Sequence, residues 1–211
     1  MRKYQKKTIE FYDKNVKEYK KNTDPLMNPE WLKKFTKYLP SKGRILDAGC
    51  AYGRDCDFFV KKEFDTYGID LSEEMIKKAK KSINNCKFSV MDVLHLDFED
   101  SFFDGIWSSA TLLHLKKEDA RKALAEFNRV LKKKGLLYLD MKEGEGEETL
   151  KDPRYSKTEK FYSYFREAEL KELLKERGFE IADHVCSSKA TKYHYTKVIY
   201  LIAKKAHSST N

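Results

Sequence analysis

The chain has 211 residues, a hydrophobic content of 40% and a formal net charge of +9. This length suits one well-buried domain and is short for two, and the hydrophobic content excludes a wholly disordered chain. No apolar run is long enough to span a bilayer, no signal-peptide core follows Met1, and the four cysteines lack a zinc-type spacing, so we expect a cytoplasmic protein with no membrane association and no metal site.

The positive charge is unevenly distributed. Residues 1–42 carry 12 basic and 5 acidic side chains, and the rest of the chain is near balance. This asymmetry indicates either an anionic substrate or RNA backbone, or a lysine-rich helix face that is only solvated. Lysine outnumbers arginine by 35 to 8, which favours the solvated face because nucleic-acid surfaces usually draw on arginine.

Two helices are expected at the start of the chain. Apolar or aromatic residues recur at helical spacing between residues 8 and 19, and the pattern predicts one helix there. Asn28 as a capping residue and Pro29 at the first helical position predict the start of a second helix. These helices make residues 1–40 a helical cap within the same domain as residues 41–211.

The stretch from Ile45 to Asp55 is the most informative in the chain. Apolar residues run into an acid, small residues then alternate, and an amphipathic run follows, which predicts a buried strand, a tight turn and a helix start. Small residues in such a turn let a ligand approach the backbone, and the helix N-terminus offers free N–H groups to it. The acid is Asp47 and the small residues are Gly49, Ala51 and Gly53.

A second strand, residues 66–70, ends in another acid. Asp70 lies 21 positions after Gly49, where a Rossmann-type fold places the carboxylate that accepts both ribose hydroxyls. A dinucleotide-binding fingerprint would need glycine at positions 51 and 54, but the chain has Ala51 and Arg54. The two motifs together therefore indicate a nucleoside-containing cofactor that is not a dinucleotide.

The pattern acid-x-Gly-x-small-x-Gly resembles motif I of the class I S-adenosylmethionine-dependent methyltransferases, with Ala51 in place of the glycine most common in that family. The resemblance covers roughly residues 40–142, with its motifs in the expected order. Its further parts are a third strand over residues 87–93, a fourth over 102–109, and a helix end over 126–135 in which Gly135 serves as a left-handed helix stop.

The pattern changes after Lys142. Residues 143–160 are polar and predict a loop, and residues 167–177 predict an amphipathic helix that Gly178 ends. Two strands follow, over residues 179–187 and 195–203. The fold class is therefore α/β: a doubly wound, Rossmann-like sheet of about seven strands, mostly parallel with a C-terminal antiparallel hairpin and with helices on both faces.

The resemblance implies S-adenosyl-L-methionine as cofactor and S-adenosyl-L-homocysteine as its product. The adenine carboxylate of the family corresponds to Asp92, and the ribose carboxylate corresponds to Asp70. The cofactor-binding residues expected from the resemblance are Asp47, Gly49, Ala51, Gly53, Arg54, Asp70, Leu71, Met75, Met91, Asp92, Val93 and Ser108.

The acceptor site is expected at the same edge of the sheet, because ligands of doubly wound sheets bind beyond the carboxyl ends of the strands. His114 follows the fourth strand and is either a general base or a packed histidine at a helix end. The other candidate substrate-binding residues are Tyr12, Tyr19, Lys142, Arg154, Tyr164 and Arg166.

These patterns favour an in-line transfer of a methyl group to a small-molecule acceptor, by a monomer or a homodimer. The first alternative is an RNA methyltransferase, because the segment around Arg154-Tyr155 and Tyr162 to Leu170 faintly resembles the wobble-uridine carboxyl methyltransferases of tRNA. The second is a catalytically silent subunit that keeps the fold, which the intact Asp47 and Asp70 disfavour.

Overall fold

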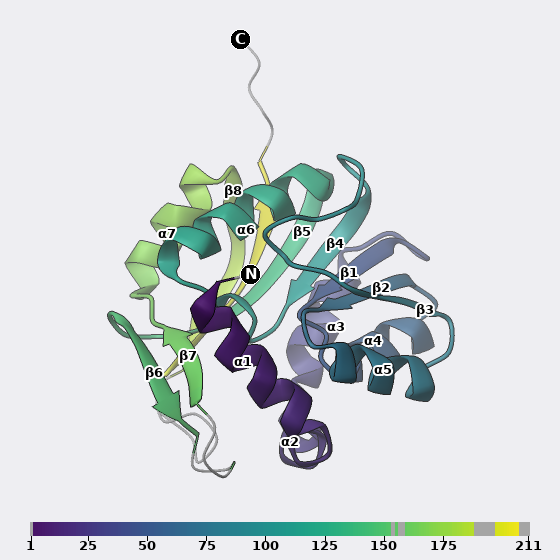
Figure 1. Cartoon of the computed structure of the whole chain (residues 1–211). Coiled ribbons are helices and arrows are strands. Elements are labelled where there is room, and N and C mark those ends of the chain that lie inside the picture. The colour runs from purple at the N-terminus through teal and green to yellow at the C-terminus, as the bar shows by residue number, and fades with distance from the viewer. Residues whose placement is uncertain (1, 153–154, 156–158, 188–196, 207–211) are drawn as a thin grey trace.

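The computed structural model describes residues 2–152, 155, 159–187 and 197–206. At its centre lies a seven-stranded sheet with the order β3-β2-β1-β4-β5-β9-β8 (Figure 1). β1 to β5 run parallel to one another, whereas β9 is antiparallel to both β5 and β8. The predicted Rossmann-like sheet with a C-terminal antiparallel hairpin is therefore confirmed. The strands of this sheet are β1 (Arg44–Ala48), β2 (Asp65–Asp70), β3 (Cys86–Val90), β4 (Phe103–Ser108), β5 (Leu131–Lys142), β8 (Phe179–Cys186) and β9 (Val198–Lys205).

Helices cover both faces of the sheet because alternate strand residues point to opposite sides and both sets are apolar. On one face, α3 and α4 pack on Ile45, Trp107 and Tyr138. On the other face, residues of α6 and α7 belong to one apolar cluster with Leu46 and Ile106. α5 lies beside α4 and contacts Phe88 of β3. The bounds are α3 (Pro29–Lys37), α4 (Arg54–Lys61), α5 (Glu73–Ser82), α6 (Lys117–Val130) and α7 (Glu167–Glu176). No helix among the described residues is long and apolar enough to span a membrane.

The N-terminal region forms two helices where the sequence predicted one over residues 8–19. α1 spans Lys3–Lys14 and α2 spans Val16–Thr23, followed by the short helix η1, Asp24–Leu26. The break falls at Asn15, whose side chain donates to the carbonyl of Phe11 at 2.7 Å. Such a local bond competes with the helical pattern of the backbone, and this explains why the helix does not run on. Figure 1 shows α1 lying across the front of the molecule, between β7 and α5.

Two sequence predictions about the second half of the chain are wrong. Residues 143–160 do not form a loop throughout, because β6 (Glu147–Lys151) pairs antiparallel with β7 (Glu159–Ser163) in a separate two-stranded sheet. Every residue of β6 is exposed, so its sequence lacks the apolar alternation that marks a strand. Gly135 is not a helix stop either: β5 begins directly after α6, and the left-handed residue of this segment is Lys134, with φ 65°.

Candidate functional site

The carboxyl ends of β1, β2, β4 and β5 meet at one edge of the sheet, and two cavities lie there. The larger has a volume of about 350 Å³ and extends from the motif I turn to β6 and β7. The smaller, of about 100 Å³, lies between α1 and the ends of β1 and β2. Both cavities are lined by Tyr12, Tyr19, Gly49, Ala51, Ser109, Ala110 and His114, so they adjoin at these residues.

The motif I turn needs its two glycines for packing inside the protein. Gly49 has φ +88°, and a Cβ there would lie 2.0 Å from the hydroxyl oxygen of Thr111. Gly53 has φ +85°, and a Cβ there would lie 2.6 Å from Ile83 and 3.1 Å from Phe88. Gly49 lines both cavities, but Gly53 faces the core between α4 and α5 and lines neither.

This packing makes Gly53 a residue of the fold, away from both cavities. Gly53→Ala places a methyl group into packed side chains at a left-handed position, so we expect a loss of roughly 1–3 kcal/mol in the free energy of unfolding. Denaturant unfolding measures this loss, and calorimetry with S-adenosylhomocysteine on the folded variant should give a nearly unchanged affinity. A Gly53→Ala protein of full stability and impaired affinity would show that Gly53 faces the ligand instead.

Asp70 is held at the end of β2 with its carboxylate toward the smaller cavity. One oxygen accepts from the backbone N–H of Ala51 at 2.9 Å, and the other accepts from that of Ser72 at 2.8 Å. Burial raises the pKa of this carboxyl, while the two backbone bonds act in the opposite direction. A carboxylate has about four lone-pair sites, so Asp70 can also accept from a ligand hydroxyl. Leu71, Met91 and Val93 line the same cavity and give it an apolar wall.

Asp47 and Arg54 lie at the other side of the turn and line the larger cavity. Asp47 is buried and accepts from the thiol of Cys56 at 3.2 Å, and burial raises its pKa well above the usual range. The Arg54 guanidinium donates to Asp55 at 2.7 Å and to the carbonyl of Thr23 at 2.8 Å. Arg54 therefore joins the end of α2 to the start of α4.

Three further residues expected to bind the cofactor line neither cavity. Met75 is fully buried in α5, and Ser108 is buried in β4. Asp92 accepts from the side chain of Gln5 at 3.3 Å and from the backbone N–H of Leu94 at 3.0 Å. The carboxylate of Asp92 thus contacts α1 and its own loop.

His114, in the short helix η2 (Leu112–His114), is held at both ring nitrogens. Nδ1 lies 2.7 Å from the carbonyl oxygen of Phe161, and Nε2 lies 2.9 Å from the hydroxyl of Tyr12. Because a carbonyl only accepts, Nδ1 carries the proton, and Nε2 accepts from Tyr12. Burial and the nearby ammonium of Lys160 lower the pKa of His114 to about 3. The imidazole is therefore neutral at physiological pH and orients Tyr12, which makes it a poor general base.

His114 should make stability depend on pH. Its pKa in the folded protein, about 3, lies below its ordinary value of 6.5, so the unfolded chain binds the proton more tightly. The free energy of unfolding should therefore fall as pH drops from about 6.5 towards 3. His114→Gln removes this contribution. We expect the variant to lose less stability than the wild type between these pH values, measured by urea unfolding; equal slopes would contradict the assignment.

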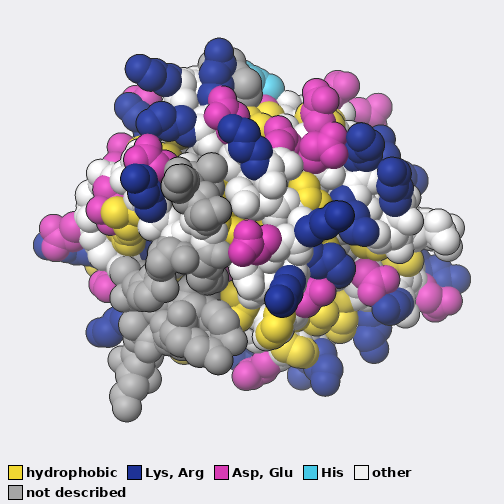
Figure 2. All heavy atoms as spheres, turned by 60° about the horizontal axis from the view of Figure 1, so that its bottom comes forward, with side chains coloured by type: hydrophobic (Ala, Val, Ile, Leu, Met, Phe, Trp, Pro, Cys, Tyr) yellow, Lys and Arg dark blue, Asp and Glu magenta, His cyan; other side chains and the backbone are white. Residues whose placement is uncertain are grey.

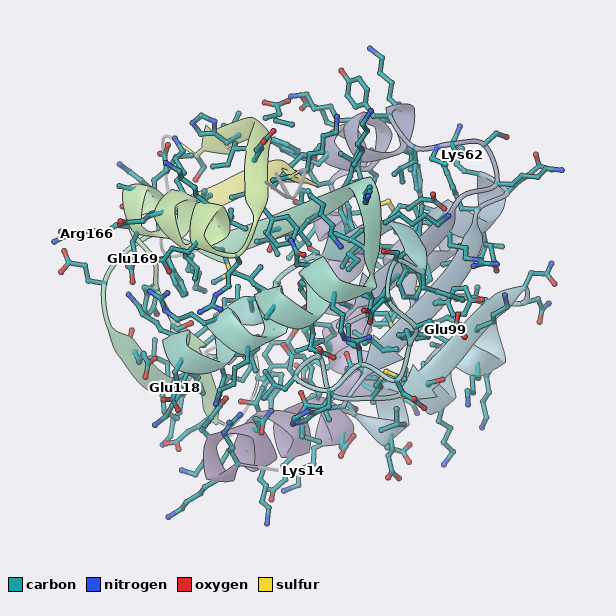
Figure 3. The ribbon with its side chains drawn as sticks, turned by 90° about the horizontal axis from the view of Figure 1, so that it is seen from above. Lys14, Lys62, Glu99, Glu118, Arg166 and Glu169 are labelled. Atoms are coloured by element: carbon teal, nitrogen blue, oxygen red, sulfur yellow. The ribbon has the colours of Figure 1, made fainter. Side chains whose placement is uncertain are left out.

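The other candidate substrate residues divide between cavity and surface. Lys142 and Tyr164 line the larger cavity, as do Tyr12 and Tyr19. Arg166 lies at the outer end of α7 near Glu169, as Figure 3 shows, and it pairs with Glu145 outside the cavities. Arg154 lies outside the described residues.

Sequence reasoning missed several residues of the larger cavity. Lys160 of β7 and Asp152 form a buried ion pair, and Asp140 accepts from Ser109 at 2.7 Å. Lys160 and Asp152 stand in a polar segment and Asp140 stands in β5, and neither context indicated a cavity. Further lining residues of this kind are Tyr52, Trp107, Glu148 and Tyr200. Among the described residues, no group of three or more His, Cys, Asp or Glu side chains is arranged to hold a metal ion.

Comparisons with known proteins agree with this geometry. The sequence profile of a family described as "Methyltransferase domain" matches residues 14–184. The chain is 34% identical over 96 residues to a malonyl-[acyl-carrier protein] O-methyltransferase of Hamiltonella defensa, which covers 46% of this chain and 36% of the relative. It is 34% identical over 122 residues to a tRNA (carboxymethyluridine(34)-5-O)-methyltransferase of Arabidopsis thaliana, with coverage of 54% and 28%. The chain thus spans less than half the length of these curated relatives.

A solved structure is similar over most of both chains. The structure of a SAM-dependent methyltransferase from Methanosarcina mazei aligns with a TM-score of 0.73 and 26% identity. The alignment covers 81% of this chain and 96% of that one. The similarity therefore extends beyond the sheet to the helices that surround it.

Proposed function

Because this chain belongs to the class I S-adenosylmethionine-dependent methyltransferases, we propose that it transfers the methyl group to a small-molecule acceptor. The larger cavity carries this proposal. Its volume of about 350 Å³ is within the range of small-molecule sites, and aromatic side chains with a few charged groups line it. β6 and β7 form part of its wall, so the acceptor would be enclosed at the sheet edge.

The fit to the cofactor rests on the smaller cavity and the turn beside it. The carboxylate of Asp70 can accept from a ribose diol, and the apolar wall formed by Leu71, Met91 and Val93 suits a base. Bound S-adenosylmethionine supplies a methyl group on a sulfonium that leaves readily. The residues shared by the two cavities would hold the acceptor atom in line with that group, and alignment supplies much of the acceleration.

We propose that residues 1–40 act as a cap whose first helix covers the cofactor. α1 is joined to the body at several points along its length. Tyr4 donates to Asp119 at 2.6 Å, and Ser72 donates to Asp13 at 2.5 Å. The smaller cavity lies beneath α1 and is lined by Gln5, Thr8 and Tyr12 of this helix, so a cofactor bound there would contact α1.

The cap gives a direct prediction for hydrogen exchange. Amides of residues 5–22 should exchange more slowly in the presence of S-adenosylhomocysteine, because the bound cofactor adds contacts beneath α1 and closes it against water. Exchange followed by mass spectrometry measures the change, with α7 as an internal control remote from the cavities. Equal exchange of residues 5–22 with and without the ligand would mean that α1 is a static flank.

One experiment separates the possible acceptors. The protein is first titrated with S-adenosylhomocysteine by calorimetry and then incubated with methyl-labelled S-adenosylmethionine and either a metabolite extract or total RNA. Label in the metabolite fraction supports the proposal, whereas label in RNA refutes it. Binding of the cofactor with no transfer to either fraction would support the catalytically silent subunit.

Two observations favour the RNA alternative: the similarity to the tRNA methyltransferase and the basic excess of residues 1–42. Two of the residues that suggested it lie in the interior: Tyr155 is buried against Phe11 of α1, and Tyr162 lines the larger cavity. On the face seen in Figure 2, basic and acidic side chains are interspersed and form no large basic patch. If the acceptor were RNA, activity would fall steeply with salt.

A further inference from the structure

Lys160 is a buried lysine, and burying its charge costs free energy of solvation. Its side chain is 3% exposed, and its ammonium lies 3.1 Å from the carboxylate of Asp152, which is 4% exposed. Removing both charges from water costs about as much free energy as their attraction returns. An apolar pair would therefore stabilise the fold about equally well. Both residues line the larger cavity, which suggests a role towards its ligand.

The surroundings of Lys160 show which ligand charge the cavity favours. The ammonium lies 4.3 Å from the ring centre of Phe11, 5.7 Å from Tyr12, 5.3 Å from Tyr155 and 5.6 Å from Tyr162. Such a ring of aromatic faces is a binding site for a cation. The chain's own lysine already fills it, so a cationic acceptor would meet a like charge there.

A second ammonium lies near the same tyrosine. Lys142, at the end of β5, places its ammonium 4.9 Å from the ring centre of Tyr162 and also lines the cavity. The ring of His114, which lines both cavities, lies 5.0 Å from that of Tyr162, so both ammoniums are close to the junction. A group held by these lysines would therefore lie within the length of one small molecule from the reacting atoms.

The four aspartates of the cavity wall are engaged by groups of the protein. Asp152 pairs with Lys160, and Asp55 pairs with Arg54 and accepts from Trp107. Asp140 accepts from Ser109, from the backbone N–H of Ala110 and from Tyr138. Asp47 accepts from the thiol of Cys56 at 3.2 Å, and Glu148 is an exposed residue of β6. These bonds reduce the attraction that the acids offer to a cationic acceptor.

We propose that the acceptor carries a carboxylate or phosphate group and that Lys160 and Lys142 hold this group beside Tyr162. This inference rests on the proposed function, since it names the chemistry of the small-molecule acceptor. The reacting atom of the acceptor then points away from the lysines, towards the junction lined by Tyr12 and His114.

The test uses probes of matched shape on the protein saturated with S-adenosylhomocysteine. Benzoate and phenyl phosphate are compared with neutral benzamide and cationic benzylamine by calorimetric titration. We expect at least one of the anions to bind at least about tenfold more tightly than benzamide and benzylamine, which corresponds to about 1.4 kcal/mol. Benzoate and phenyl phosphate together distinguish a carboxylate from a phosphate.

Variants locate the binding site of the anion. Lys142→Met should weaken binding of the preferred anion by at least about tenfold. Lys7→Met is the matched control, because Lys7 pairs with Glu159, the neighbour of Lys160 on β7, outside the larger cavity. Lys160→Met is combined with Asp152→Leu, so that no buried charge is left alone if the single variant fails to fold.

The outcomes separate this inference from the proposed function. Equal or tighter binding of benzylamine, no binding of either anion, or unchanged anion binding by Lys142→Met would each overturn the anionic acceptor. Failure to bind S-adenosylhomocysteine would instead refute the proposed function, and the same probes on the free protein would then still report the preference of the cavity. An anion that raises the pKa of His114, followed by NMR, would support the location near the junction.

Discussion

Asp70→Ala should weaken cofactor binding by at least about tenfold, because hydrogen bonds to a charged acceptor contribute about 1.5–3 kcal/mol each. The variant loses the proposed bonds to the ribose and also the two bonds that anchor the turn, from the N–H groups of Ala51 and Ser72. Calorimetry with S-adenosylhomocysteine measures the affinity, and circular dichroism confirms the fold. Asp92→Ala should cost less, because Asp92 lines neither cavity and contacts Gln5 and its own loop.

Asp65→Ala is a control on the same strand: it shows whether losing any aspartate of β2 weakens cofactor binding, or only losing Asp70. Asp65 begins β2 at its amino end and pairs with Lys87 and Arg44 at the surface. Asp65→Ala should leave the affinity unchanged. A folded Asp70→Ala protein with the affinity of the wild type would refute the assignment of Asp70.

The sheet and the cofactor side of the site were predictable because their signals are local. A buried parallel strand is a short apolar run, and the residue at its carboxyl end stands next to it in the sequence. Asp47 and Asp70 could therefore be placed at one edge from their order alone, and both lie there. The chain's similarity to methyltransferases added the identity of the cofactor.

Why glycine is required at positions 49 and 53 was not predictable from the local sequence. Both were expected to leave room for the ligand. A Cβ at Gly53 would instead meet Ile83 and Phe88, which only the fold brings close to it. His114 shows the same limit. Its position after β4 was evident, but the carbonyl of Phe161 that fixes its tautomer lies 47 residues further along the chain.

The acceptor side depends on contacts between distant segments. Lys160 stands in a run of polar residues that is typical of a solvated loop, and no local pattern distinguishes it from its neighbours. It is buried only because α1, about 150 residues earlier, packs on β7 and places Phe11 and Tyr12 against it. β6 was missed for a related reason, since its exposed residues carry no apolar period.

The buried ion pair should make Lys160→Met the most destabilising of these substitutions. The variant leaves the carboxylate of Asp152 buried beside a methyl group instead of an ammonium, and breaking such a pair costs about 3–5 kcal/mol. Adding Asp152→Leu should restore most of the free energy of unfolding, because it removes the unpaired buried charge and leaves two apolar side chains that can pack together. Urea unfolding of the two single variants and the double variant gives their coupling energy.

Lys7→Met provides the comparison on the surface. Lys7 and Glu159 are both more than one third exposed at the side chain, and such pairs contribute about 0–1 kcal/mol. A Lys160→Met protein that loses no more stability than Lys7→Met would show that the Lys160 ammonium is not held as a buried charge. If the double variant Lys160→Met and Asp152→Leu is stable but no longer binds the anionic probes, the ion pair is needed for the ligand and not for the fold.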